Sequence, residues 1–545
     1  MKTNPTLLCQ LLIVLMISAC NRQKEEANDR PNIIYIMADD LTTQAISAYD
    51  NGIFDDIAPT PHMDRLAKEG MIFQSVMCTN AICGPSRAAI LTGDYSHING
   101  YYKNQNGGEF DSTKWTFPQE FQKNGYQTSL FGKWHLGSDP VGFDEFKIHA
   151  AAGQQGLYWD PIYNHNGKQV KETGYATNLS TDFALNWLDS ADRSKPFLML
   201  LQFKAPHRAW QPDKKYETLW DDIEMPYPAN FNDDYKGREL TAGDTEMTMD
   251  YLNRSDMKLT PPEGLTGADL MKWNFYGINR GEIVQPEGMT AEEGRKWRYQ
   301  IYIKDYLACV KSVDDNIGRL LDYLDKKGLT ENTMIVLTSD QGFYLGEHNF
   351  FDKRFIYEES LRMPFIIRYP QRVQAGTENK DVIANIDFAP TFLEVAGIKT
   401  DHNMQGRSFA SMLDGVTPDD WRQSMYYHYY EFPFWHHVQP HYGIRTEKYT
   451  LAHFYYNIDK WELFDLEKDP SQMNNVIDDP AYKEVVMDLK NQLKSLQEQY
   501  AEDANLDHYR EITDRDFGSI ITTDMMKPGE FEKAVRDKTD DNKKN

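Results

Sequence analysis

The stretch NIIYIMADD, from Asn32 to Asp40, carries an apolar, β-branched run directly into a pair of carboxylates. A short, uninterrupted apolar run of this kind predicts a strand that is buried on both faces of a sheet. Similar runs recur along the chain, and helical patterns lie between them at Thr181–Leu188 and Tyr306–Leu324. Strands that alternate with helices predict an α/β domain with a largely parallel sheet. The further strand-like runs are Thr128–Phe131, Phe197–Phe203, Met334–Thr338 and Phe365–Arg368.

Metal-binding or cationic side chains appear soon after each of the first four predicted strands. Ligands of open α/β sheets bind beyond the carboxyl ends of the strands. We therefore expect a single site at this edge of the sheet. Its candidate side chains are Asp39 and Asp40, Lys133 with His135, His207, and Asp340 with Gln341.

The composition is that of a large, acidic globular protein. The chain has 545 residues, 40% of them hydrophobic, which is enough for one large domain and a smaller one. No basic stripe offsets the formal net charge of −25, which argues against nucleic acid as a partner. The same charge argues against a long polyanion lying across the surface. An anionic substrate would have to be small and to enter a locally basic pocket.

The amino-terminal segment has the pattern of an export signal. Lys2 precedes the apolar stretch Leu7–Ile17, which is too short to span a bilayer. Small residues then lead to Cys20, and this pattern resembles a bacterial lipobox; an ordinary signal peptide that contains a cysteine is the alternative. We expect residues 1–20 to be a lipoprotein signal peptide and residues 21–30 to be a tether. The protein would then be exported to the periplasm or the outer-membrane surface and would touch the membrane only through its lipid anchor.

The predicted domains follow changes in composition. Residues 31–415 are expected to form the α/β domain, with the polar, Pro- and Gly-rich segment 212–298 as an insertion over the cleft. Residues 421–510 are expected to form a small antiparallel sheet with one amphipathic helix near Ala481–Tyr500. The charged tail 533–545 is predicted to be disordered. The strand-like segments of the second domain are Ser424–Glu431, Gly443–Tyr449 and Trp461–Leu466.

Cysteine usage singles out one motif. Cys78, Cys83 and Cys309 are too few for a disulfide framework in an exported chain of this size, and at least one thiol is left over. The stretch CGPSRAAILTG, which begins at Cys83, is similar to the C-x-P-S-R motif of the type I sulfatase family. A free cysteine at the start of a helix is the alternative, because Pro85 and Ser86 suit a helix N-terminus.

The resemblance extends over most of residues 31–500 and implies both a fold and a chemistry. The implied fold is an alkaline-phosphatase-like α/β/α sandwich with a smaller C-terminal α+β domain. The resemblance also implies that a formylglycine-generating maturation enzyme oxidises Cys83 to Cα-formylglycine. One hydroxyl of the hydrated aldehyde would attack sulfur, and the other would lose its proton so that the aldehyde re-forms and sulfate leaves. A helix N-terminus at this position would favour the bound anion.

The acidic residues at the strand ends offer oxygen ligands without cysteine or histidine. Such ligands suit Ca²⁺, or second to it Mg²⁺, rather than zinc. The resemblance implies that a bound ion would polarise the sulfate and lower the pKa of the attacking hydroxyl. The family often has Asn where this chain has Gln341, but both side chains supply an amide oxygen. Helix capping and turn formation are the structural alternatives for these residues. The implied ligands are Asp39, Asp40, Asp340, Gln341 and the formylglycine from Cys83.

Three further motifs resemble sulfate-binding motifs of the family: GKWHLG at residues 132–137, APH at 205–207 and FDKR at 351–354. The resemblance implies that Lys133 and Lys353 hold sulfate oxygens. It implies that His135 contacts the formylglycine hydroxyl and assists sulfate release, and that His207 protonates the departing alcohol. Arg87 would orient the formylglycine.

Within the family the chain is most similar to bacterial N-acetylglucosamine-6-O-sulfatases. This resemblance implies that Asp352 and Arg354 bind sugar hydroxyls through charge-assisted hydrogen bonds, with His453 or His441 contributing from the second domain. The alternative is that these histidines only pack the small sheet. The expected substrate is a mono- or oligosaccharide with a 6-O-sulfate on N-acetylglucosamine or glucosamine, from heparan sulfate, heparin or mucin. Another sulfated carbohydrate position, a phosphonate or phosphate ester, and a non-catalytic glycan-binding lipoprotein are the alternatives.

Overall fold

The computed structural model describes residues 30–104, 109–252, 256–259, 264, 266, 283–284, 286–433, 436–503 and 505–522. Its main feature is a ten-stranded sheet in which the central strands run parallel and antiparallel pairs flank them. In spatial order the strands are β12 (Thr377–Asn379), β2 (Met71–Phe73), β11 (Phe365–Arg368), β9 (Thr333–Thr338), β1 (Asn32–Ala38), β8 (Phe197–Phe203), β4 (Gln127–Gly132), β5 (Glu145–His149), β6 (Ile162–His165) and β7 (Lys168–Lys171).

Strand β1 lies between β9 and β8 and is buried along its whole length. Successive side chains of a strand point to opposite faces. One apolar cluster therefore contains Ile33, Tyr35 and Met37, and the other contains Ile34 and Ile36. This arrangement explains why the sequence of β1 is apolar without interruption.

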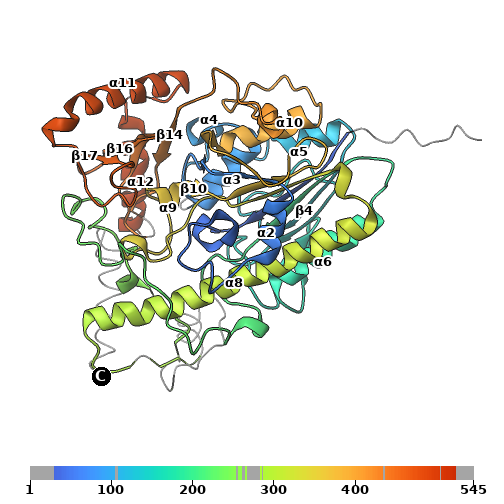
Figure 1. Cartoon of the computed structure of the whole chain (residues 1–545), viewed down its shortest axis with the longest axis horizontal. Helices are drawn as coiled ribbons and strands as arrows, with labels where there is room; N and C mark the ends of the chain where they lie inside the picture. The colour runs from blue at the N-terminus through green and yellow to red at the C-terminus, as the bar shows by residue number, and fades with distance from the viewer. Residues whose placement is uncertain are drawn as a thin grey trace, which may run out of the picture.

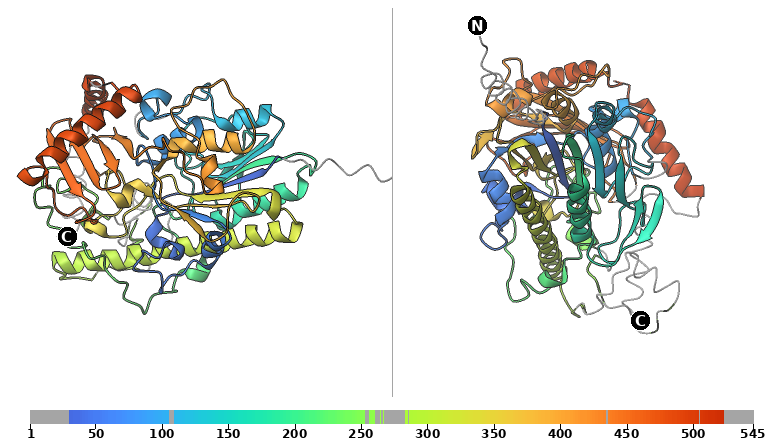
Figure 2. Two further views of the ribbon diagram at one scale, coloured as in Figure 1. Left: turned by 45° about the horizontal axis from the view of Figure 1, so that its top comes forward. Right: turned by 90° about the vertical axis from the view of Figure 1, so that its right-hand side faces the viewer.

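Helices cover both faces of the sheet, as Figures 1 and 2 show. The long helix α8 (Ala291–Lys327) packs with α6 (Ala176–Ser190) and α2 (Pro61–Lys68) on one face. Helices α3 (Cys83–Thr92), α5 (Phe117–Lys123) and α10 (Phe388–Val395) cover the other face. The predicted α/β/α sandwich is confirmed.

A second sheet lies toward the C-terminal end of the described chain. Its four strands are antiparallel, and α11 (Lys483–Gln499) packs against three of them. The predicted antiparallel sheet with one helix is confirmed, and a further helix, α12 (Asp507–Thr522), follows. The strands are β14 (Ser424–Tyr429), β15 (His441–Thr446), β16 (Tyr449–Phe454) and β17 (Lys460–Asp465).

Several short elements complete the described structure. A three-stranded sheet, in the order β10-β3-β13, lies beside the α/β core. These elements are β10 (Arg362–Met363), β3 (Val76–Met77), β13 (Ile383–Ala384), α4 (Ser96–Asn99) and α9 (Glu358–Leu361).

Two predicted elements differ from the observed ones. The segment Gly443–Tyr449, expected to be one strand, contains the end of β15, a turn and the start of β16. Helix α8 begins well before the predicted Tyr306, and its first residues belong to the expected insertion 212–298. The side chain of Thr290 accepts a hydrogen bond from the backbone N–H of Glu293 and so caps this early start.

The predicted signal peptide, with Cys20, and the predicted tail 533–545 lie outside the described residues, as does the tether up to residue 29. Within the described part of the chain, no helix combines the length and the apolar character needed to cross a bilayer. Cys78, Cys83 and Cys309 are buried there as free thiols.

Candidate active site

The strand ends and the N-terminus of α3 meet at one edge of the large sheet. Asp39 and Asp40 directly follow β1, Asp340 lies two residues beyond β9, and Lys133 directly follows β4. Cys83 is the first residue of α3. The topology thus brings together the residues that the sequence placed after separate strands, as expected for a parallel sheet.

Helix α3 is held against the strand ends along its first turn. The hydroxyl of Ser86 donates to the carbonyl oxygen of Asp340, and the backbone N–H of Gly84 donates to Oδ1 of Asn104 at 3.1 Å. A Cβ atom at Gly84 would lie 2.4 Å from the ring of Tyr101, so only glycine fits this contact. Cys83 is 1% exposed at the start of this helix.

The acidic residues contain the unused oxygens that a cation site requires. Oδ1 of Asp39, Oδ2 of Asp40 and Oε1 of Gln341 are buried and have no hydrogen-bond partner among the described residues. Ligand atoms of Asp39, Asp40 and Cys83 lie within 4.8 Å of one another. Buried polar atoms without partners are rare in native proteins. These residues therefore fit a hard divalent cation with oxygen ligands.

Asp340 has a different environment from the other two aspartates. Its Oδ1 accepts a hydrogen bond from the backbone N–H of Asp40 at 3.2 Å. Its Oδ2 accepts one from Nε of Arg87 at 3.0 Å, and NH2 of Arg87 lies 3.4 Å from Oδ1 of Asp39. Arg87 thus connects two of the predicted metal ligands.

Two lysines neutralise part of the acidic charge. Lys133 pairs with Asp39, and Nζ of Lys353 lies 2.7 Å from Oδ1 of Asp40. Burial opposes ionisation of Asp39, but Lys133 and the neighbouring cations hold its pKa well below the usual value. Burial raises the pKa of Asp40 to about 7, with Lys353 opposing and the other aspartates adding to the shift. A further cation next to Asp40 would therefore stabilise its ionised form.

Two histidines, His135 and His207, lie near these aspartates and lysines. His135 lies in the left-handed region at φ 55°, and its Nε2 lies 2.8 Å from Nε2 of Gln155. Nδ1 of His207 lies 2.7 Å from the carbonyl oxygen of Arg208, and its Nε2 lies 3.8 Å from Oδ2 of Asp40. Burial and the charge of Lys133 lower the pKa of both histidines well below the usual value. Both rings are therefore neutral without a bound anion.

Two of the four predicted sugar-binding residues, Asp352 and Arg354, lie next to Lys353. Asp352 and Arg354 lie on either side of Lys353 at the site, and NH1 of Arg354 donates to Tyr429 and Glu431 at 2.9 and 3.0 Å. Strand β14 of the second sheet thus reaches the site.

His441 and His453 use their ring nitrogens in contacts within the protein, which argues against their predicted role in sugar binding. His441 is fully buried. Its Nε2 accepts a hydrogen bond from the N–H of Ile356, and its Nδ1 lies 2.8 Å from the carbonyl oxygen of Gln439. The ring of His453 stacks on Trp461 with centroids 4.2 Å apart and contacts Asp459. Both histidines pack the second sheet, as the structural alternative expected.

Several residues at the site were not found from the sequence. Gln155, Gln202, Arg208, Glu431 and His436 contact the predicted residues directly. The position of Arg208 directly after the APH motif was a usable signal. The others lie in loops or on a buried strand, and no spacing pattern marked them.

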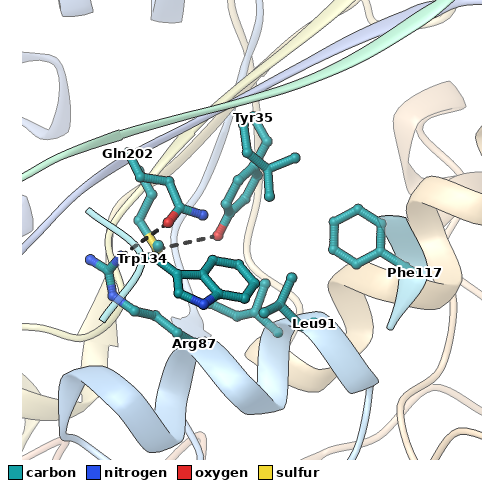
Figure 3. Close-up of a pocket in the computed structure, with 9 residues that line it drawn as sticks. Tyr35, Arg87, Leu91, Phe117, Trp134 and Gln202 are labelled. Atoms are coloured by element: carbon teal, nitrogen blue, oxygen red, sulfur yellow. Dashed lines mark hydrogen bonds between the residues drawn. The ribbon is translucent and has the colours of Figure 1, made fainter. Parts of the chain in front are cut away.

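A small cavity lies behind Arg87, on the side of the guanidinium facing the core (Figure 3). Its lining is mostly apolar and includes Phe117, Leu91 and Trp134. Gln202 also lines the cavity, and its Oε1 accepts a hydrogen bond from NH1 of Arg87 at 3.1 Å. The cavity therefore belongs to the packing that holds Arg87 and is not a substrate pocket.

Comparisons with known proteins agree with this geometry. A family model described as "Sulfatase" matches residues 31–398, and one described as "N-sulphoglucosamine sulphohydrolase, C-terminal" matches residues 346–499. The chain is 44% identical over 519 residues to an N-acetylglucosamine-6-O-sulfatase of Bacteroides thetaiotaomicron, with 92% of each chain covered.

Two solved structures extend the comparison. One, described as a complex with its substrate D-glucosamine-2-N,6-O-disulfate, has 43% identity and a TM-score of 0.81, covering 87% of this chain and 99% of its own. The other, a phosphonate monoester hydrolase of Agrobacterium radiobacter, shares the fold with a TM-score of 0.66 at 20% identity, covering 86% of this chain and 96% of its own.

Proposed function

Because this chain belongs to the sulfatase family, we propose that it is a glycan sulfatase that hydrolyses the 6-O-sulfate of N-acetylglucosamine or glucosamine. The observation that carries the proposal is the position of Cys83, at the N-terminus of α3 and beside Asp39 and Asp40. The 44% identity to an N-acetylglucosamine-6-O-sulfatase supports the choice of substrate. Heparan sulfate, heparin and mucin are the glycans that would supply it.

The environment of Cys83 disfavours a thiolate as the nucleophile, and this supports a formylglycine in its place. Burial raises the pKa of the Cys83 thiol to about 12, although Lys353 and Lys133 act in the opposite direction. A thiol with this pKa stays protonated at neutral pH and is a poor nucleophile. A hydrated aldehyde at this position would supply one hydroxyl to attack sulfur and a second whose deprotonation releases sulfate. A maturation enzyme would have to act before Cys83 is buried.

The side-chain oxygens of Asp39, Asp40 and Gln341 that accept no hydrogen bond from the described residues, together with Asp340, would hold Ca²⁺, and Mg²⁺ is the second choice. Bound there, the ion would supply Lewis-acid stabilisation to the sulfate oxygens. Arg87 positions Asp39 and Asp340 by its contacts with both carboxylates.

The lysines and histidines would divide the remaining tasks. Lys133 and Lys353 would each exchange part of their contact with a carboxylate for a sulfate oxygen. A sulfate between them would offset their charges, and this would raise the pKa of His207 toward the range of a general acid. The hydrogen bond at Nδ1 orients His207, leaving Nε2 to pass a proton to the departing sugar oxygen. His135 presents Nδ1, which is buried without a partner among the described residues, and would assist sulfate release.

Asp352 and Arg354 would bind hydroxyls of the sugar ring through charge-assisted hydrogen bonds. The net charge of −25 favours a terminal sugar or a short oligosaccharide over an intact polyanion. We further propose that Cys20 anchors the exported protein by a lipid, in the periplasm or at the outer-membrane surface.

The test is a panel of 6-O-, 4-O-, 3-O- and 2-O-sulfated amino sugars with a phosphate monoester, assayed with Ca²⁺ and with chelator. The protein is co-expressed with a formylglycine-generating enzyme. We expect turnover of 6-O-sulfated N-acetylglucosamine, loss of turnover with chelator, and no turnover by Cys83→Ala. Equal activity on a 4-O-sulfated galactosamine would contradict the specificity, and faster turnover of the phosphate ester would contradict the reaction class.

A further inference from the structure

Three segments bring polar side chains together around Asp352, next to the sulfate-binding Lys353. Oδ2 of Asp352 lies 3.3 Å from Nε2 of His436 and 3.7 Å from NH1 of Arg208. NH1 of Arg208 lies 2.9 Å from the same Nε2. Asp352, Arg208 and His436 are here called the Asp352 cluster. It is separate from the metal ligands, and Asp352 alone of its members belongs to a family motif.

The side chains of the Asp352 cluster are buried and held by further contacts. Arg208 and His436 are each 7% exposed, and Asp352 is 2% exposed. Nε of Arg208 donates to Oδ1 of Asp256 at 3.1 Å, and its NH2 pairs with Oδ2 of the same carboxylate. The ring of Phe351 contacts both partners, with its centroid 5.1 Å from the Arg208 guanidinium and 5.1 Å from the His436 ring.

Backbone hydrogen bonds join the loops that carry the cluster. The N–H of Glu246 and the hydroxyl of Thr245 donate to the carbonyl oxygen of His436 at 2.8 and 2.7 Å. The N–H of Phe351 donates to the carbonyl oxygen of Met247 at 2.9 Å. Residues 245–247 thus fix the His436 loop and the Asp352 loop relative to each other. Such preorganisation is what a specificity site needs.

The hydrogen-bond pattern leaves Oδ2 of Asp352 next to a nitrogen of His436 that cannot donate to it. Nδ1 of His436 lies 3.1 Å from the carbonyl oxygen of Glu246, which can only accept, so Nδ1 carries the proton of the neutral ring. Nε2 then has a lone pair, and it accepts from NH1 of Arg208. The same nitrogen cannot donate to Asp352 as well. NH1 of Arg208, at 3.7 Å, lies beyond hydrogen-bond distance of Oδ2 of Asp352, so this oxygen can still accept a hydrogen bond from a ligand.

We propose that Arg208 and His436 are positioning residues, which hold Asp352 so that its Oδ2 accepts a hydrogen bond from one ring hydroxyl of the sulfated sugar. The position in the site supports this role. Arg208 directly follows His207, which would serve the departing oxygen, and Asp352 directly precedes Lys353, which would bind the sulfate. The cluster therefore lies on the leaving-group side, where the sugar ring must be. This inference rests on the proposed function and deepens it.

The test compares His436→Phe and Arg208→Met with wild type on the sulfated sugar that wild type hydrolyses fastest. We expect kcat/KM to fall about tenfold or more, because a buried charge-assisted hydrogen bond loses its geometry. Inhibition by inorganic sulfate, which occupies only the anion pocket, should stay within about twofold of wild type. His402→Phe is the matched control, since His402 stacks on Trp115 and pairs with Asp94, and it should behave as wild type.

Sugars that lack the 3- or the 4-hydroxyl give the second readout. Removing the hydroxyl read by Asp352 should lower wild-type kcat/KM about tenfold and should cost the two variants little more, as in a double-mutant cycle. If the losses from the variant and from the missing hydroxyl add up, the proposal is overturned. It is also overturned if inhibition by sulfate weakens as much as kcat/KM falls, because a general packing defect would then explain the variants. Failure of the proposed function would appear separately, as a wild type that hydrolyses none of the sulfated sugars, and would remove this inference with it.

Discussion

Asp40 shows how the surroundings of one side chain indicate a ligand. Its Oδ1 receives hydrogen bonds from Lys353 and Gln341, whereas its buried Oδ2 has no hydrogen-bond partner among the described residues. Burial raises the pKa of this carboxyl to about 7 in spite of Lys353. A divalent cation at Oδ2 would remove both the unpaired acceptor and the unfavourable ionisation.

We therefore expect Asp40→Asn to weaken Ca²⁺ binding by at least about tenfold, since ligand charge sets the affinity of such sites. Turnover at low Ca²⁺ should fall in parallel. Isothermal titration of the metal-free protein measures the affinity, and Asp192→Asn, a change on the exposed surface, is the control. An unchanged affinity would show that the ion is not held by this carboxylate.

At this scale the sequence predicted residues inside motifs and missed residues that only the fold brings near. Asp39, Asp340 and Lys133 follow strands, so the rule for parallel sheets locates them. His436 comes from a loop that follows β14, and nothing in its own neighbourhood points to Asp352. The resemblance implies a sugar-binding role for His441 or His453, but Nε2 of His441 accepts a hydrogen bond from the N–H of Ile356 and Nε2 of His453 contacts Asp459.

Among the secondary-structure elements, α3 has the most demanding environment. It is buried from end to end and its first turn contacts Tyr101 and Asn104. The side chains of Tyr101 and Asn104 pack directly against the backbone of this first turn. Gly84 provides this contact because it has no Cβ.

Gly84→Ala should destabilise the protein by about 1–3 kcal/mol, because its Cβ would overlap the Tyr101 ring at 2.4 Å and Oδ1 of Asn104 at 2.5 Å. Denaturant unfolding measures this change. Gly294→Ala is the matched control in the first turns of α8, where the nearest atom is the end of the Arg298 side chain at 3.3 Å. That change should be neutral or stabilising by up to about 1 kcal/mol. Equal effects of both substitutions would refute the packing argument.

Element types were predictable from the sequence, and some boundaries were not. The apolar strands β1, β8, β9 and β11 are marked by their composition. Buried side chains keep helical spacing upstream of Tyr306, at Tyr299, Tyr302 and Ile303, so this part of α8 was predictable. The start of the helix depends on the capping residue Thr290. The pair β15 and β16 is joined by a short turn without glycine or proline, so the aromatic run predicted one strand instead of two.

On the scale of the whole molecule, a buried polar cluster attaches the C-terminal segment to the second sheet and to helix α4. Glu502 contacts His428 of β14 and His97 of α4, each at 3.2 Å. Burial opposes ionisation of Glu502, but the two histidines hold its pKa well below the usual value. Burial likewise opposes protonation of His97, and Glu502 nevertheless raises its pKa.

These shifts give the stability contribution of Glu502 a defined pH window. A lowered carboxyl pKa stabilises above the unfolded value of about 4.3 and loses its effect as pH falls, whereas a raised histidine pKa stabilises fully below about 6.5 and loses its effect as pH rises. Glu502→Gln should therefore lower the melting temperature most between about pH 5 and 6.5. Thermal unfolding from pH 3 to 8 tests this; a difference from wild type that does not change with pH would contradict it.

The layered architecture as a whole followed from the alternation of strands and helices, and the docking of the second sheet did not. That docking depends on single contacts such as Arg354 with Glu431, between residues far apart in the sequence. Periodicity carries no information on such pairs. It is nevertheless this docking that places β14 beside the loop of residues 352–354.

The central claim is that the aldehyde form of residue 83 carries the reaction. The most direct measurement compares turnover of 6-O-sulfated N-acetylglucosamine with the fraction of aldehyde at residue 83, determined by peptide mass in preparations matured to different extents. The account predicts that turnover rises in proportion to the aldehyde fraction and vanishes when all of residue 83 is cysteine. Full turnover by protein that retains only the cysteine form would contradict it.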